Sequence, residues 1–148
     1  MIAVDTNILV AFQRLEYPQH DRAVEIVTDL AEGSALWALP WPCLHEFFGV
    51  VTHPRIFKTP TPLEHALAAM SALLESPSVR LLTEGPGHWE RISRLILAGH
   101  IAGPAVHDAR IAAICLAHGV RELWTADRDF SRFPALKTRN PLVTSQSL

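Results

Sequence analysis

The chain has 148 residues, of which 49% are hydrophobic and 19% are charged. This length fits a single domain spanning residues 1–148 with a substantial core, and the composition excludes a disordered or fibrous protein. Thirteen Lys and Arg residues against 15 Asp and Glu residues give a net charge of -2, so the chain lacks the basic character of most nucleic-acid-binding domains, although basic residues gather in its last third.

Short apolar runs alternate with amphipathic segments along the chain, which predicts strands that alternate with helices. We expect strands at 2–4, 35–39, 79–82 and 122–124, and a short fifth strand at 140–143. We expect helices starting near residue 8 and at 20–32, 42–52, 63–75, 88–98 and 106–118. This alternation is typical of a parallel sheet with helices on both of its faces.

Polar residues and prolines set several of the predicted boundaries. Thr6 or Asn7 is expected to cap the first helix, and Pro40 is expected to end the second strand. The Pro-rich segment 53–62 is predicted to be a surface loop rather than a lip over a substrate site. Among the four tryptophans, Trp41 is flanked by prolines and is expected to be the most exposed.

The cysteines and the apolar segments indicate in which cellular compartment the protein is expected. Cys43 and Cys115 each lie in an apolar run, which favours buried free thiols over a disulfide framework. No signal peptide is expected, because Asp5 interrupts the N-terminal apolar segment almost at once. The longest apolar stretch, 35–44, contains prolines and is too short to span a bilayer. We therefore expect a cytoplasmic protein without a membrane segment.

Five acidic residues lie directly after predicted strands or inside predicted helices. Asp5 follows the first predicted strand, Glu46 lies inside the third helix, and Asp108 lies in the first turn of the last helix. Asp127 and Asp129 follow the fourth strand. Because open α/β sheets build their sites at the carboxyl ends of the strands, these acids are predicted to converge. Clustered carboxylates repel each other and suit a hard divalent cation such as Mg²⁺ or Mn²⁺, so the pattern predicts a metal-dependent enzyme acting on phosphate esters.

Each acid also has a structural explanation when it is considered alone. Asp5 can cap the first helix, and Asp108 can favour its helix through the macrodipole. Glu46 can be an ordinary exposed helix residue. Asp127 and Asp129 resemble the start of a calcium-binding loop, but glycine is absent at the sixth position and glutamate at the twelfth. It is the order of all five along the chain that favours a shared site.

The residue types permit a specific chemistry. One or two Mg²⁺ ions held by Asp5, Asp108 and Asp127 could polarise a phosphate and lower the pKa of bound water. Glu46 could be a further ligand, or could orient that water. Arg128, between the last two aspartates, could pair with a carboxylate or reach a substrate phosphate.

Two segments resemble the end motifs of the PIN-domain nucleases: Val4-Asp5-Thr6-Asn7-Ile8-Leu9 and Thr125-Ala126-Asp127-Arg128-Asp129-Phe130. The small size, and a resemblance that extends over about residues 1–143, are similar to the VapC toxins of bacterial toxin–antitoxin pairs. The resemblance implies a three-layer α/β/α sandwich. The residues that match functional positions of the family are an acidic quartet (Asp5, Glu46, Asp108, Asp127), a further acid that assists through water or metal (Asp129), and three supporting polar residues (Thr6, Asn7, Thr125).

The activity implied by this resemblance is metal-dependent endoribonuclease cleavage, with tRNA or rRNA as the substrate and Mg²⁺ or Mn²⁺ as the cofactor. A cognate antitoxin would bind the protein and block its site. Homodimers are common in such a family, so a homodimer is a further expectation.

Other phosphate-handling α/β enzymes fit less well. A haloacid-dehalogenase-type phosphatase requires a second Asp where this chain has Asn7. A receiver domain requires a paired acid near the first strand and a Lys after the last strand. A nucleotide-binding domain requires a glycine-rich phosphate loop, and Gly85-Pro86-Gly87 stands in the wrong context. The remaining alternative is a non-catalytic RNA- or protein-binding module on the same fold, whose mark would be the loss of one or more acids.

Overall fold

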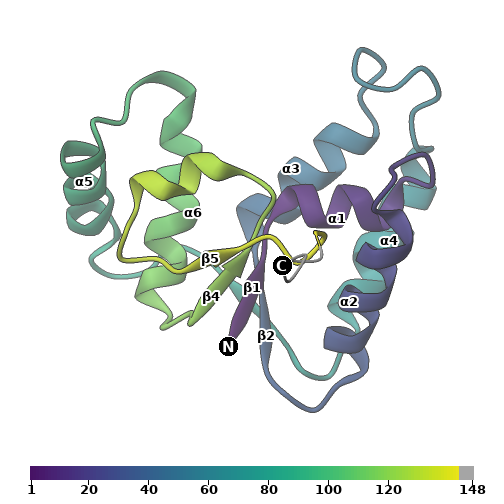
Figure 1. Ribbon diagram of the computed structural model, residues 1–148, viewed down its shortest axis with the longest axis horizontal. Coiled ribbons are helices and arrows are strands. Elements are labelled where there is room, and N and C mark those ends of the chain that lie inside the picture. The colour runs from purple at the N-terminus through teal and green to yellow at the C-terminus, as the bar shows by residue number, and fades with distance from the viewer. Residues whose placement is uncertain (144–148) are drawn as a thin grey trace, which may run out of the picture.

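The computed structural model describes residues 1–143 of the chain (Figure 1). Five strands form one sheet in the order β3-β2-β1-β4-β5. The strands are β1 (Ile2–Val4), β2 (Trp37–Pro40), β3 (Val79–Leu82), β4 (Glu122–Trp124) and β5 (Thr138–Arg139). Every pairing between neighbours is parallel. The predicted parallel sheet of four to five strands is therefore confirmed.

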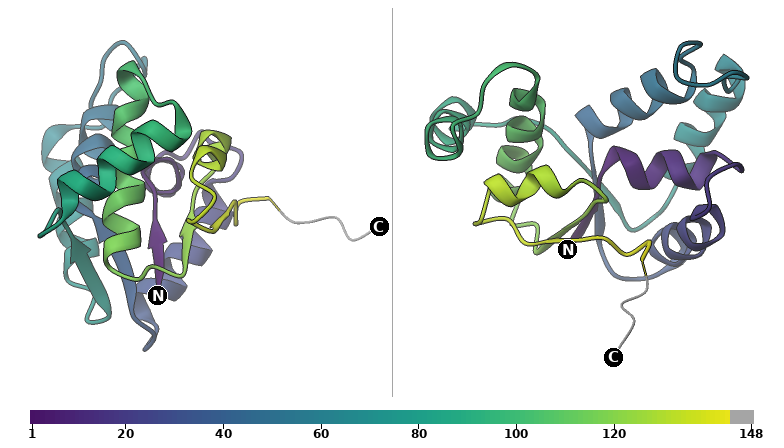
Figure 2. Two further views of the ribbon diagram at one scale, coloured as in Figure 1. Left: turned by 90° about the vertical axis from the view of Figure 1, so that its left-hand side faces the viewer. Right: turned by 45° about the horizontal axis from the view of Figure 1, so that its top comes forward.

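Helices cover both faces of this sheet. They are α1 (Thr6–Gln13), α2 (His20–Glu32), α3 (Trp41–Val51), α4 (Leu63–Leu74), α5 (His88–Gly99) and α6 (Val106–Ala117), with short 3₁₀ helices η1 (Gly103–Ala105) and η2 (Arg128–Arg132). Helices α5 and α6 lie on one side of the strands, whereas α1 to α4 lie on the other (Figures 1 and 2). The fold is the expected three-layer α/β/α sandwich.

The alternation of side chains along the strands divides the core in two. Ala3 and Ala38 belong to the cluster beneath α6. Their sequence neighbours Val4, Trp37 and Leu39 belong to the cluster beneath α1 to α4. Because successive residues of a strand point to opposite faces, three or four residues of each inner strand suffice to anchor both helical layers.

The last strand differs from the prediction. The expected strand at 140–143 is wrong, because pairing with β4 occurs at Thr138–Arg139. Asn140 then accepts a hydrogen bond from the backbone N–H of Leu142 through Oδ1, at 3.0 Å. Such a local Asn turn bends the chain out of the extended conformation. The paired residues are polar and exposed, so an apolar run did not mark this strand.

The second strand begins two residues later than expected. Ala35 and Leu36 are exposed, and pairing with β3 starts at Trp37, opposite Val79. Trp37 is fully buried, and its indole N–H donates to Ser76 Oγ at 3.1 Å. Burial of this large ring, rather than the apolar character of the preceding residues, sets the start of β2.

The expectation for the tryptophans is wrong. Trp41 is only partly exposed and packs against the His45 ring, with 5.9 Å between ring centroids. Trp89, near the start of α5, is the exposed one, with 75% of its surface accessible. Ile92 of α5 belongs to the apolar cluster on this side of the sheet, and Trp89 is not among the residues that pack against that cluster. Within residues 1–143, no helix combines the length and apolarity that crossing a membrane requires.

We predict that Phe47→Ala lowers the free energy of unfolding by about 3–5 kcal/mol, because it leaves a cavity between α3 and the sheet. The Phe47 side chain is fully buried. Urea denaturation measures the change. Leu67→Ala is the matched control, since Leu67 on α4 is 53% exposed and its loss should change stability by less than about 0.5 kcal/mol. Equal effects of the two substitutions would contradict the described packing of α3.

Candidate active site

The site lies at the point in the sheet where the order of strand addition reverses. The chain builds β1, β2 and β3 outward on one side, and then returns to place β4 on the other side of β1. In open α/β sheets, ligands bind at the carboxyl ends of the strands at such a switch point. Asp5 follows β1 and Asp127 follows β4. The two strand ends are joined by a hydrogen bond from Asp5 N–H to the carbonyl of Trp124, at 2.9 Å.

Asp5 is the deepest acid of the site, with only 4% of its surface exposed. It is the N-cap of α1, where its Oδ1 accepts the Thr6 backbone N–H at 2.8 Å. The expected cap, Thr6 or Asn7, is therefore wrong by one or two positions. The Cys43 thiol lies 3.5 Å from the same oxygen and donates to it. Helix capping and a role in the site are thus combined in one carboxylate.

Thr125 links the two strand ends through its hydroxyl. It donates to Asp5 Oδ2 at 2.7 Å, and it accepts from Asn7 Nδ2 at 3.1 Å and from the Asp127 backbone N–H at 3.0 Å. Asn7 completes the connection, because its Oδ1 accepts the Ala126 N–H at 2.9 Å. A hydroxyl has one donor and two acceptor positions, so Thr125 uses its full capacity here.

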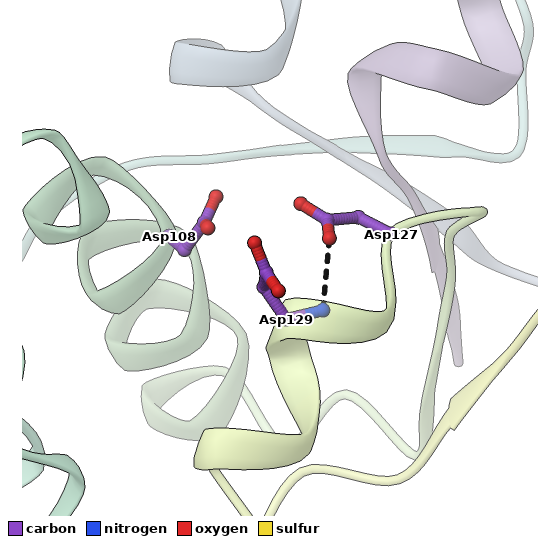
Figure 3. Close-up of side chains that lie close together, drawn as sticks. All are labelled: Asp108, Asp127 and Asp129. Atoms are coloured by element: carbon purple, nitrogen blue, oxygen red, sulfur yellow. Dashed lines mark hydrogen bonds between the residues drawn. The ribbon is translucent and has the colours of Figure 1, made fainter.

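Three aspartates lie together at the mouth of the site (Figure 3). Oxygen atoms from Asp108, Asp127 and Asp129 all lie within 4.8 Å of one another. Asp108 comes from the first turn of α6, and Asp127 caps η2 by accepting the Asp129 N–H at 2.8 Å. Asp129 is exposed, whereas the other two are partly buried. The structure therefore brings together three of the acids that were predicted from the sequence.

A cavity of about 210 Å³ unites four of the five predicted acids. The carboxylates that line it are those of Asp5, Glu46, Asp108 and Asp127. Glu46 reaches it from α3, and its Oε2 accepts a hydrogen bond from Thr6 Oγ1 at 3.2 Å. Asp129 does not line this cavity, although it contacts the same aspartate group at the mouth.

Burial and crowding of these carboxyl groups raise the pKa of three of them. Burial, followed by the charges of Asp127 and then Asp5, raises the pKa of Asp108 from 3.8 to about 6. Burial also raises the pKa of Asp5, against the lowering effect of the Thr125 hydrogen bond. The pKa of Glu46 is raised by burial and by the negative charge of Asp5. Each carboxyl is therefore harder to ionise than it is in water.

In the part of the chain that the structure describes, no Lys or Arg forms an ion pair with this cluster. Within residues 1–143, the ion pairs of Arg and Lys are all made with acids outside the site. Arg128 is exposed and pairs with none of the neighbouring aspartates. Hard oxygen donors, crowded together without a cationic partner, fit a divalent cation such as Mg²⁺ or Mn²⁺. The Asp108, Asp127 and Asp129 group offers three such donors from two elements.

The sequence did not identify every residue of the site. Val10, Tyr17 and Val50 form an apolar wall of the cavity. Val50 lies four residues after Glu46, a spacing that places both on one face of α3 and could have revealed it. Tyr17 lies in the loop after α1, where no periodicity applies. His107 lies with Glu46 and Asp108 around an adjoining cavity, and its electrostatic effect only partly opposes the burial that raises the pKa of Glu46.

The chain is similar to known proteins over most of its length. The family described as "PIN domain" matches residues 2–136. Ribonuclease VapC48 of Mycobacterium tuberculosis is 31% identical over 137 residues, which cover 93% of this chain and 94% of that protein.

Solved structures show the same fold. The crystal structure of VapC20 from Mycobacterium tuberculosis, described as a sarcin-ricin loop cleaving toxin, has a TM-score of 0.66 at 18% identity, and the match covers 88% of this chain and 93% of that chain. A toxin–antitoxin complex from Klebsiella pneumoniae contains a chain with a TM-score of 0.63 at 18% identity, with coverage of 95% and 98%.

We predict that Asp108→Asn stabilises the protein in EDTA at pH 8 by about 1 kcal/mol, after allowance for the screening of a partly exposed charge. The pKa of Asp108 is about 6 in the fold against an ordinary 3.8, so ionisation of this group opposes folding increasingly between these two pH values and fully above pH 6. The gain should fall as the pH drops from 6 towards 3.8, and should be mostly lost at pH 4, where the folded group is protonated and the unfolded group is close to its own pKa. Urea denaturation at pH 8 and pH 4 measures both values.

The matched control for this prediction is Asp21→Asn, which removes an exposed acid from the first turn of α2. Asp21 stabilises its helix through the macrodipole, so this substitution should give no gain at pH 8. A gain for Asp108→Asn that was equally large at pH 4 would contradict the electrostatic explanation.

We predict that Thr125→Val destabilises the protein by about 1–3 kcal/mol, because the loss of one hydroxyl leaves buried polar partners unpaired. Thr125 is itself 3% exposed. Thr125→Ser keeps the hydroxyl and should cost less than half as much. Unfolding in urea measures both variants, and a loss for Thr125→Ser as large as that for Thr125→Val would contradict the prediction, because it would mean that the methyl group contributes as much as the hydroxyl.

Proposed function

This chain belongs to the PIN-domain family, and we propose that it is a metal-dependent endoribonuclease that serves as the toxin of a toxin–antitoxin pair. The observation that carries the proposal is the convergence of Asp5, Glu46, Asp108 and Asp127 on one cavity without a cationic partner in residues 1–143. The relationship to ribonuclease VapC48 supports the same activity.

The aspartates are the proposed ligands of the metal. Asp108, Asp127 and Asp129 offer closely spaced oxygen atoms, and Asp5 offers a further carboxylate in the same cavity. A Mg²⁺ or Mn²⁺ ion bound there would supply Lewis-acid polarisation of the scissile phosphate and a more acidic bound water. Its positive charge would favour the ionised carboxylates and so offset the raised pKa values of Asp5 and Asp108.

Supporting residues fix the orientation of these carboxylates. Thr125 and Asn7 both donate to Asp5 Oδ2, so they hold that carboxylate and leave its plane little freedom to rotate. Thr6 donates to Glu46 and joins α1 to α3 at the cavity. Hydrogen bonds of this kind keep ligating groups in the geometry that a metal requires.

Glu46 and Arg128 are proposed to act on water and substrate. Glu46 has a raised pKa and accepts a hydrogen bond from Thr6, so its carboxylate can orient an attacking water and accept its proton. Arg128 is exposed next to Asp127 and Asp129, where its guanidinium can reach a phosphate of the RNA.

The substrate is proposed to be tRNA or rRNA, since the structurally similar VapC20 is described as cleaving the sarcin-ricin loop. A cognate antitoxin is the proposed protein partner, by analogy with the Klebsiella pneumoniae complex. The proposed compartment is the cytoplasm, where a protein would meet these RNAs. We also propose that residues 1–148 act as one domain, and the homodimer stays a prediction of the family resemblance.

The alternative of a non-catalytic binding module finds no support in the site, which retains all five acids.

We predict that the purified protein cleaves total tRNA or ribosomal RNA into discrete fragments in the presence of Mg²⁺ or Mn²⁺, and that EDTA abolishes cleavage. Asp5→Asn should lower the rate at least about a hundredfold, as expected for the loss of a group that stabilises the transition state. Gel electrophoresis of end-labelled RNA measures the rates. Asp29→Asn, which removes an exposed acid from α2, should cleave at the wild-type rate.

Cleavage that persists in EDTA would reject the metal-dependent mechanism. Binding of RNA without cleavage under any metal condition would instead favour the non-catalytic module. Equal losses in Asp5→Asn and Asp29→Asn would show that the substitutions act through folding rather than through the site.

A further inference from the structure

The cavity that contains the carboxylates has a second, chemically different wall. Val10 from α1, Val50 from α3 and Tyr17 from the loop after α1 line it together with the four acids. Val10 lies five residues beyond Asp5, which is about 7 Å along the helix axis. The cavity volume of about 210 Å³ is below the roughly 300–1,000 Å³ of pockets that enclose drug-sized ligands, so it suits a fragment of a larger substrate.

Tyr17 is held in this wall by an aromatic contact. Its ring centroid lies 6.3 Å from that of Phe57, and the two planes are inclined by 45°. This tilted arrangement is a favourable geometry for an aromatic pair. Phe57 is 8% exposed, so it forms a firm support from the loop between α3 and α4. The Arg14 guanidinium lies against Phe57, with Cζ 4.0 Å from the ring centroid.

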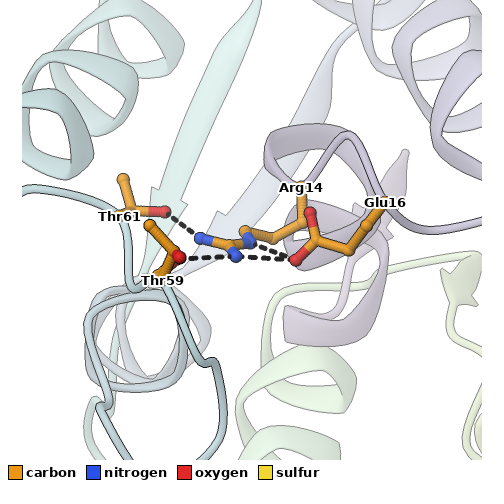
Figure 4. Close-up of polar contacts among 4 residues, drawn as sticks. All are labelled: Arg14, Glu16, Thr59 and Thr61. Carbon is orange, nitrogen blue, oxygen red and sulfur yellow. Dashed lines mark hydrogen bonds and ion pairs between the residues drawn. The ribbon is translucent and has the colours of Figure 1, made fainter.

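Arg14 fixes this support by binding both loops (Figure 4). Its guanidinium donates to Thr61 Oγ1 at 3.1 Å and to the Thr59 carbonyl at 2.9 Å. It also pairs with Glu16 Oε1 at 2.6 Å, one residue before Tyr17. The Arg14 side chain is only 12% exposed, which is unusual for a residue with its charge. The loop that carries Tyr17 and the loop that carries Phe57 are therefore tied together.

The part of a ligand that contacts this wall is expected to be apolar rather than anionic. Four carboxylates line the same cavity, so an anionic group is excluded from its apolar end unless a cation accompanies it. An aromatic ring beside two valines favours a flat apolar surface, and nucleobases stack on aromatic side chains in this way. The apolar residues and the acids line the same cavity, so a base and a phosphate of one nucleotide can contact it together.

We propose that Val10, Tyr17 and Val50 form the subsite for the nucleobase next to the scissile phosphate, with the Tyr17 ring as its stacking surface. The inference rests on the proposed ribonuclease function and adds a specificity-determining residue to it. Because Tyr17 is held by Phe57 and Arg14 before the RNA arrives, little ordering is needed when a base binds. Bases that stack strongly are favoured at this position of the RNA.

The first test exploits the fact that Tyr17 is the only tyrosine of the chain. Incorporation of 3-fluorotyrosine gives a single ¹⁹F resonance from this ring. The protein is titrated in Ca²⁺, as a non-catalytic substitute for Mg²⁺, with a hexaribonucleotide of adenosine and with an abasic chain of the same length. The adenosine hexamer should shift the resonance, and the abasic chain should not. Equal shifts with the two probes, or no shift with either, would overturn the proposal.

The second test measures cleavage of an RNA that the wild-type protein cuts. Tyr17→Leu should lower kcat/KM about tenfold to a hundredfold, the range that corresponds to loss of one stacked base. Tyr17→Phe keeps the ring and should stay within a few-fold of wild type. An abasic nucleotide beside the cleavage site should slow the wild type but impose no further loss on Tyr17→Leu. Leu15→Ala is the control, since Leu15 is 81% exposed and outside the cavity.

These outcomes separate the inference from the function on which it rests. If the wild type cleaves RNA and Tyr17→Leu has the same penalty on intact and abasic substrates, Tyr17 has only a structural role and the subsite is rejected. If the wild type cleaves no RNA but the ¹⁹F resonance responds only to the base-containing hexamer, the ribonuclease function fails and the base subsite stands. Urea denaturation of Tyr17→Leu and Tyr17→Phe shows whether either variant is unfolded.

Discussion

The burial of the Asp5 carboxyl group at the switch point of the sheet is the constraint on which the rest of the site depends. A buried carboxylate is costly unless hydrogen bonds satisfy it. Those bonds come from Thr6 and Asn7 at the start of α1 and from Thr125 after β4. Because Thr125 also accepts the Asp127 N–H, the group that satisfies Asp5 also positions the loop of the next aspartate. Satisfying one buried acid therefore determines where Asp127 lies.

The same arrangement lowers the stability of the folded protein. Carboxylates that converge without a cationic partner repel one another, and the pKa of Asp108 rises to about 6 in consequence. The two apolar clusters on either side of the sheet supply the stability that this repulsion removes. A bound cation would offset this repulsion by favouring the ionised carboxylates.

Helix α1 connects the two chemical halves of the cavity. Its N-cap is Asp5, and Val10, which is buried in the same helix, lines the apolar wall. Its C-terminal end carries Arg14, which supports Phe57 and, through Phe57, Tyr17. A single rigid element therefore sets the spacing between the acidic group and the aromatic ring. A rigid spacing of this kind lets one site recognise a phosphate and its neighbouring base together.

The sequence by itself determined the elements and the acids. Strand and helix periodicities are local, so the alternation of elements and the parallel sheet follow from short windows of the chain. The positions of Asp5 and Asp127 after two strands were sufficient to predict that they converge, because parallel strands end at one edge. Tertiary structure alone decided the hydrogen bond between Thr125 and Asp5, which are 120 residues apart, and the place of Tyr17 in the cavity wall. It also decided where the last strand pairs, because backbone pairing with β4 needs no apolar residue to mark it. Contacts of this kind depend on which segments the completed fold brings side by side, and no local pattern records that.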